Sequence, residues 1–228
     1  MLDKGNTSRD KMLAALTEEN SPFLGEGKNI LIEEFGTDHV TYFSILTCIA
    51  SGMKTRSEIE NELGNNNIGS YLVKLEDYYK VISKSLPIFA KENSKKVRYQ
   101  LNDCFLMFWF RFIESNRSVI EMGKYDILKE IIQSGYPQFS GIMLERYFRM
   151  RYSEHPHVTE VGNWWDKNSE NEIDVIAIEK LHKRVTIAEV KRNPEKINLQ
   201  TLTDKFAVLR PHFRGYDIQF VPLSLNDM

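Results

Sequence analysis

Residues 172–191 constrain the fold of this 228-residue chain more than any other segment. They contain two short β-branched runs, EIDVIAIE and RVTIAEVK, joined by a few polar residues. Short apolar runs of this composition, bounded by polar residues, are typical of buried strands. A tight turn at 181–183 would make them a hairpin and bring Asp174 close to Glu189. Because side chains alternate along a strand, Lys191 is then expected on the same face as Glu189.

The charged side chains of this hairpin predict a cation site. Unpaired charge is costly to bury, so two carboxylates among core residues need a partner, and a divalent cation is a suitable one. Mg²⁺, or Mn²⁺, takes oxygen ligands, and the hairpin offers the carboxylates of Asp174 and Glu189. In a phosphodiesterase the metal activates water, while a lysine such as Lys191 stabilises charge on the phosphoryl group. The Val190 carbonyl and Glu172 are further candidate ligands.

The composition limits the classes of function. A net charge of −2 gives no global basic field, so any nucleic-acid surface must be local. Cys48 and Cys104 lie in apolar, helix-like runs, which favours reduced buried thiols and a cytoplasmic protein over a disulfide or a metal site. No apolar run reaches the ~20 residues of a membrane span, and the polar N-terminus differs from a signal peptide. No Walker-type sequence is present, so ATPase activity is not expected.

Three parts are expected along the chain. Residues 1–36 form an N-terminal helical segment, residues 37–134 a second region, and residues 135–228 a third. In the second region Thr37 is a candidate cap of a helix ending near residue 50. Thr55 and Glu58 have the spacing of a capping box, and Asp103 is placed to cap a later helix.

The second region has the element order of a winged helix. Three helical patterns ending near residue 77 precede strand-like runs at 81–83 and 97–101. The third pattern offers Lys74 as its one cation, so binding of another protein is as well supported as binding of DNA. Candidate contacts to a nucleic-acid backbone are the cations around the polar tip of the wing and one after the hairpin: Lys95, Lys96, Arg98 and Arg192.

The third region is predicted to be an α/β domain. Gly135 and Pro137 mark a boundary at 134–137, and a helix is expected from Ser140 to Tyr152. A strand at 158–165, the hairpin, a helix at 198–209 and a strand at 217–223 follow. This order predicts a central mixed sheet flanked by helices, and an α+β chain overall. The cations of this region have two interpretations, a rim that faces phosphate groups or an ordinary solvated surface. These cations are Arg146, Arg149, Arg151, Arg192 and Lys196.

The two carboxylates and the lysine of the hairpin resemble the D…(D/E)-x-K core of the restriction-endonuclease-like, or PD-(D/E)XK, nucleases. The proline of the family name is absent, because Ile173 precedes the aspartate. The resemblance implies Mg²⁺-dependent cleavage of nucleic-acid phosphodiesters, DNA being the expected substrate. It also implies that Glu145, in the first helix of that fold, is an accessory catalytic acid and that Gln200 lies beside the site.

A narrower resemblance extends over most of the chain. Its motifs are YQLNDCFLMFWFRF, LERYF, GNWW, EIDVIA and AEVK, at 99–112, 144–148, 162–165, 172–177 and 188–191. This succession is similar to the C-terminal half of archaeal-type AAA/STAND ATPases, in which a P-loop module precedes a winged helix and a nuclease-like domain. The P-loop module is missing here. The alternatives to a nuclease are therefore a non-catalytic DNA-binding or regulatory module of a P-loop ATPase, and a protein–protein adaptor.

Overall fold

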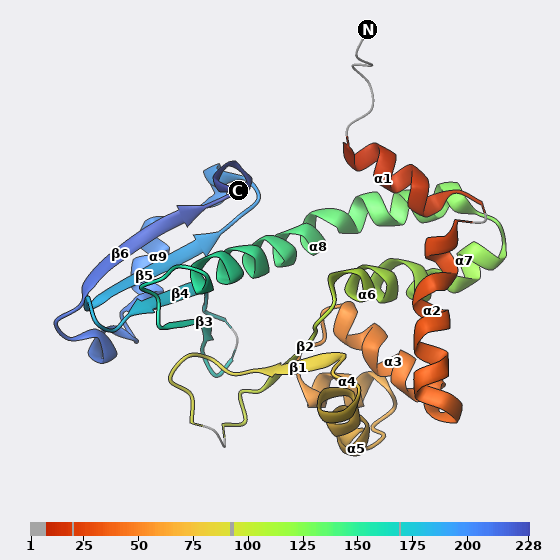
Figure 1. Cartoon of the computed structure of the whole chain (residues 1–228), viewed down its shortest axis with the longest axis horizontal. Helices are drawn as coiled ribbons and strands as arrows, with labels where there is room; N and C mark the ends of the chain where they lie inside the picture. The colour runs from red at the N-terminus through yellow and green to blue at the C-terminus, as the bar shows by residue number, and fades with distance from the viewer. Residues whose placement is uncertain (1–7, 20, 92–93, 169) are drawn as a thin grey trace, which may run out of the picture. The chain divides into compact units, whose positions relative to one another are not determined.

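The computed structural model describes residues 8–19, 21–91, 94–168 and 170–228. Its contacts divide the chain into two units (Figure 1). Unit 1 comprises Met1–Ser85 and Arg98–Tyr136, and unit 2 comprises Leu86–Val97 and Pro137–Met228. The mixture of helices with a four-stranded mixed sheet confirms the predicted fold class. Within the described ranges, no helix has both the length and the mean hydropathy to cross a membrane.

Unit 1 is mostly helical and contains one small antiparallel sheet. The sheet pairs β1 (Ile82–Ser85) with β2 (Arg98–Leu101), so that Ile82 lies opposite Leu101. The helices are α1 (Ser8–Thr17), α2 (Pro22–Phe35), α3 (His39–Ala50), α4 (Arg56–Glu62), α5 (Gly69–Val73), α6 (Cys104–Phe108), α7 (Arg117–Glu121) and the first part of α8 (Tyr125–Ser153). Two π-helical turns extend α5 and α6, at Lys74–Tyr78 and Trp109–Ile113.

Two of the three predicted helix caps in unit 1 are present. Thr55 and Glu58 form the reciprocal bonds of a capping box at the start of α4. The Asp103 carboxylate accepts a hydrogen bond of 2.7 Å from the Leu106 amide at the start of α6. The Thr37 cap was wrong, because Thr37 lies in a 3-10 turn (Gly36–Asp38) and α3 begins after it without a side-chain cap.

An aromatic core holds the helices of unit 1 together. Trp109 and Phe110 are 1% and 0% exposed, and both rings contact Phe43 edge-on. The Trp109 indole N–H donates to the Leu24 carbonyl at 3.2 Å, which satisfies its polar atom inside the core. Gly27 of α2 lies directly against this ring, and a Cβ there would approach Trp109 Cδ2 to 2.5 Å. The close approach of α2 to the Trp109 ring therefore explains why a glycine lies in the interior of this helix.

Helix α8 runs without interruption from Tyr125 to Ser153, with Pro137 inside it. The helix expected to start at Ser140 therefore begins earlier, at Tyr125, and the boundary between the two units, after Tyr136, falls inside it. A proline inside a helix costs about 3 kcal/mol, because its N–H is missing and its ring crowds the preceding turn. Packing on both sides of the proline offsets this cost. Leu128 is buried in the first part of α8 and Leu144 in the second.

Unit 2 is built around a sheet with the order β3-β4-β5-β6 (Figure 1). Its strands are β3 (Glu160–Trp165), β4 (Glu172–Glu179), β5 (Arg184–Val190) and β6 (Asp217–Leu223). The first three are antiparallel neighbours, and β6 is parallel to β5. The sheet is thus mixed, as predicted. Helix α9 (Leu199–Phe206) begins after Asn198, whose side chain caps it.

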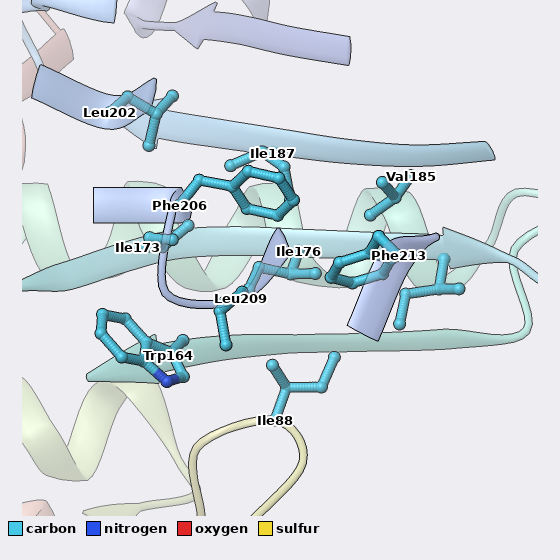
Figure 2. Close-up of a cluster of buried hydrophobic side chains, with 11 residues drawn as sticks. Ile88, Trp164, Ile173, Ile176, Val185, Ile187, Leu202, Phe206, Leu209 and Phe213 are labelled. Carbon is cyan, nitrogen blue, oxygen red and sulfur yellow. The ribbon is translucent and has the colours of Figure 1, made fainter. Parts of the chain in front are cut away.

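Each face of this sheet is covered by a different helix. On one face Leu202 and Phe206 of α9 pack with Ile176 and Ile187, in the cluster shown in Figure 2. On the other face the second part of α8 packs on the sheet, in a cluster formed by Leu144, Phe148, Val175, Ala188, Val190 and Leu223. The hairpin is buried on both faces, which explains why its apolar runs are nearly continuous.

The segment between β1 and β2 belongs to unit 2 rather than to unit 1. Ile88 joins the α9-side cluster, and its amide donates to the Asn163 carbonyl of β3 at 2.9 Å. Phe89 stacks on His212 with ring centroids 4.5 Å apart. Ile88 and Phe89, which precede the polar tip that sequence patterns assign to a wing, therefore pack within unit 2.

Candidate metal and phosphodiester site

The hairpin of β4 and β5 has the register that brings the two acids together. Val175 pairs with Ala188 and Glu179 with Arg184, which places Asp174 opposite Glu189. The connecting turn covers residues 180–183, one residue more than predicted. The prediction that Lys191 shares a face with Glu189 is confirmed, since Lys191 Nζ lies 2.8 Å from Glu189 Oε1.

An irregularity in β4 occurs at the aspartate itself. On β3, Gly162 and Trp164 are two positions apart, but their partners on β4, Ile176 and Ile173, are three apart. The extra residue makes this a β-bulge, a feature often found next to active sites because it redirects a side chain. The bulge also breaks the alternation of side chains between the two faces of β4, because Ile173 and Ile176 both join the α9-side cluster. The candidate role of Glu172 depends on that alternation.

Asp174 is a desolvated carboxylate held by its own hairpin. It is 8% exposed, and its Oδ2 accepts a hydrogen bond of 2.8 Å from the Val190 amide. Lys191 Nζ lies 3.5 Å from the same oxygen. Burial raises the pKa of Asp174, although Lys191 and the Val190 amide act in the opposite direction. A carboxyl group with this environment gains strongly from any additional cation.

Glu189 lies between two ammonium groups from different elements. Besides Lys191 at 2.8 Å, Lys205 Nζ of α9 lies 3.4 Å from its Oε2. The Lys205 side chain is 18% exposed and the Glu189 side chain 12%. Lys205 is a candidate site residue that the sequence patterns did not indicate. The signal is its place beside Leu202 and Phe206 on the apolar side of a helix that follows a buried acid.

Lys191 remains positively charged in this environment. Burial acts against its charged form, but Asp174, Glu189 and Glu145 outweigh burial and raise the pKa of Lys191. An ammonium with a raised pKa does not act as a general base near neutral pH. It serves instead as a fixed positive charge and hydrogen-bond donor, which suits the predicted role beside a phosphoryl group.

Helix α8 contributes Glu145 and Arg149 to the same end of the sheet. Arg149 Nη1 donates to the Asp174 backbone carbonyl at 2.9 Å and lies 3.7 Å from Glu145 Oε2. Burial lowers the pKa of Arg149, while Glu145 and Asp174 oppose that change. The Arg149 guanidinium thus fixes the main chain at Asp174, a position inside the unit rather than on the predicted phosphate-facing rim. Glu145 interacts with this arginine one turn earlier in α8.

The site suits a hard divalent cation in its donor chemistry. Both carboxylates lie within 3.5 Å of Lys191 Nζ, and the hydrogen bonds to the Asp174 carboxylate from described residues all end on Oδ2, which leaves Oδ1 for an ion. Mg²⁺ is commonly held by one or two carboxylates and several waters. Over the described ranges, no group of three or more His, Cys, Asp or Glu side chains is arranged to hold a metal. An ion at this site would therefore rely on Asp174, Glu189 and water.

The four candidate nucleic-acid contacts differ in exposure. Lys95 is exposed, and Lys96 and Arg192 are half-buried. Arg98 is 8% exposed, so its guanidinium is not presented at the surface. Among the described residues, the Gln200 side chain makes no hydrogen bond to Asp174 or Glu189. Its side-chain amide instead donates to Asp204 of the same helix at 3.0 Å.

Part of this chain is similar in sequence to proteins of archaea and bacteria. Residues 109–201 match the profile of a family described as archaeal and bacterial proteins of unknown function (DUF234). That stretch contains Glu145, Asp174, Glu189 and Lys191 but ends before Lys205. An uncharacterized protein of Methanocaldococcus jannaschii is 35% identical over 160 residues, which cover 66% of this chain. The chain spans 35% of the length of that relative. No solved structure matches.

Proposed function

We propose that unit 2 is a metal-dependent nuclease of the PD-(D/E)XK type, which cleaves phosphodiester bonds of nucleic acid. One observation carries the proposal. Asp174, Glu189 and Lys191 converge at one end of the β4–β5 hairpin, with the lysine within 3.5 Å of both acids. Two carboxylates that share a cation are the minimal apparatus for metal-assisted phosphodiester hydrolysis. The resemblance of their spacing to the D…(D/E)-x-K core supports the same reaction.

The residues of the site divide the work between them. Asp174 and Glu189 would hold Mg²⁺ or Mn²⁺, which when bound lowers the pKa of a water and neutralises phosphoryl charge. Lys191 donates a hydrogen bond toward the attacking water or a phosphoryl oxygen and stabilises negative charge there. Arg149 holds the backbone of Asp174, and Glu145 orients that arginine. Glu145 is therefore a positioning residue in this proposal.

Unit 1 and the cations near the site would serve substrate binding. Helices α3, α4 and α5 and then the β1–β2 hairpin follow one another in the order of a winged helix, and that assignment is part of the proposal. Lys95, Lys96 and Arg192 are the proposed contacts to the nucleic-acid backbone, and DNA is the proposed substrate. Contacts of this kind are weakened by salt, because binding releases counterions from the phosphates.

A cleavage assay with matched variants tests the proposal. Purified wild-type chain is incubated with single- and double-stranded DNA and RNA while Mg²⁺ or Mn²⁺ is titrated. Asp174→Ala and Lys191→Ala are each expected to lower the cleavage rate by at least ~100-fold. Asp126→Ala, an exposed acid in the first turn of α8, is the control and should cleave like wild type. Metal-dependent cleavage that survives in Asp174→Ala would refute the assignment.

A second proposal follows from the length of the relative. Since this chain spans 35% of that protein, it corresponds to a part of a larger architecture there. The chain would then be a non-catalytic DNA-binding or regulatory module that acts with a P-loop ATPase. This alternative predicts salt-sensitive DNA binding without cleavage at any metal concentration. Binding of neither DNA nor RNA, together with capture of a defined P-loop protein, would instead favour an adaptor.

A further inference from the structure

A pocket of about 380 Å³ opens in unit 2 beside the acid site. Its lining comes from the end of β3, the loop before β4, helix α9 and the segment before β2. Lys205 lines this pocket and also lies 3.4 Å from Glu189. The pocket and the acid pair therefore share one ammonium group. In addition, Trp164 pairs with Ile173, the residue before Asp174. Trp164 and Asp174 therefore lie at the same end of the sheet.

The pocket combines positive charge with an apolar wall. Lys96, Lys167 and Lys205 contribute three ammonium groups. Trp164 and Val208 form an apolar part of the lining, and Trp164 lies at the edge of the core cluster in Figure 2. Cations beside an aromatic and apolar surface suit a ligand with a negative group on one side and a flat ring on the other. A nucleotide has that combination.

The acids of the pocket are engaged within the protein. The Asp166 carboxylate accepts hydrogen bonds from the backbone amides of Asn168, Glu170 and Asn171 and from the Asn171 side chain. These bonds lower the pKa of Asp166 and hold the loop before β4 in place. Asp204 accepts from Gln200. Both carboxylates thus have internal donors, while the Lys96 and Lys167 ammonium groups have no ion pair among the described residues.

The geometry points to a nucleotide subsite: the pocket holds one nucleotide of the substrate strand, next to the phosphodiester at the acid pair. Its base packs against Trp164 and Val208, and its phosphate faces Lys96, Lys167 and Lys205. A volume of about 380 Å³ lies at the lower end of the range for small-molecule pockets and admits one nucleotide, not a base pair. The position next to the scissile bond rests on the proposed nuclease function, but the binding of a nucleotide does not.

Calorimetry with thymidine 5′-monophosphate, without metal, tests the pocket separately from catalysis. One nucleotide is expected per chain, with affinity that falls as salt rises. Lys167→Ala is expected to weaken binding roughly tenfold, because a charge-assisted hydrogen bond is lost. Thr201→Trp places a large side chain into the pocket from an exposed position of α9 and should abolish binding. Lys129→Ala, an exposed lysine of α8 in unit 1, is the control and should bind like wild type.

Two outcomes would overturn the subsite. One is absence of nucleotide binding, or binding that Thr201→Trp leaves unchanged. The other is equal affinity for inorganic phosphate and the nucleotide, since the apolar wall would then contribute nothing. Asp174→Ala separates the two proposals, because it should lose cleavage and keep nucleotide binding. Nucleotide binding without Asp174-dependent cleavage would refute the nuclease proposal alone. Asp174-dependent cleavage without nucleotide binding would refute the subsite alone.

Discussion

Two glycines of α8 give a quantitative test of this helix, which carries Glu145 and Arg149. A Cβ at Gly135 would approach Phe112 Cε1 to 2.6 Å and Cζ to 3.2 Å, whereas a Cβ at Gly141 would meet no atom within 4 Å. Alanine is favoured over glycine in a helix interior by about 1 kcal/mol. Overpacking a core typically costs about 1–3 kcal/mol. Gly141→Ala should therefore raise the free energy of unfolding by about 1 kcal/mol, and Gly135→Ala should be about 1–3 kcal/mol less stable than Gly141→Ala.

Urea unfolding followed by circular dichroism and tryptophan fluorescence measures this difference. Both glycines lie in one continuous helix, so the gain in helix propensity cancels between the variants and the steric cost remains. Phe112→Leu in the Gly135→Ala background should recover part of the loss, and a double-mutant cycle gives the coupling energy. If Gly135→Ala is as stable as Gly141→Ala, Phe112 does not pack on this turn. If Gly141→Ala destabilises, the helix is not continuous through that position.

Three further predictions concern the site and a helix cap. Asp174→Asn should abolish metal-dependent cleavage but stabilise the metal-free chain by about 1 kcal/mol near neutral pH. Folding raises the pKa of Asp174, so this group favours the folded state below its unfolded pKa of about 3.9, and that contribution is lost as pH rises through the folded pKa. The stability that Asp174→Asn gains over wild type in urea titrations should therefore vanish near pH 4. Lys205→Ala should cost about 1–2 kcal/mol in the same assay, since Glu189 keeps one ammonium partner, whereas Lys129→Ala should change stability by less than about 0.5 kcal/mol. Thr55→Ala removes the side-chain acceptor of a capping box and should lower the thermal unfolding temperature of unit 1, at a cost of about 1 kcal/mol.

The sequence predicted the parts of the fold that depend on local chemistry. The β-branched runs and the polar turn determine the hairpin, and its register follows once the turn is short, so Asp174 and Glu189 meet as expected. Helix α8 shows where local reasoning fails. Gly135 and Pro137 are breaking residues by propensity, but buried contacts along both parts of the helix outweigh them.

The parts of the site that could not be predicted depend on packing between elements. The bulge in β4 reflects the pairing of β3 with β4, and no residue type marks it in the sequence. Lys205 reaches Glu189 only because α9 lies across the sheet on the face of Ile187. Arg149 is drawn inward in the same way, since α8 covers the opposite face and carries its guanidinium to the Asp174 carbonyl. Each contact joins residues far apart in the chain, so helical and strand periodicity alone do not reveal it.

These contacts explain how the fold accommodates two buried carboxylates. Lys191 Nζ lies within 3.5 Å of both acids and Lys205 Nζ lies 3.4 Å from Glu189, so each carboxylate has a cationic partner. One lysine directly follows β5 and the other lies in α9, so the core fixes the backbone of both. In the proposed nuclease these lysines would lie beside the phosphodiester, and the charge that stabilises the acids in the free protein would be available to the substrate once an ion is bound to the carboxylates.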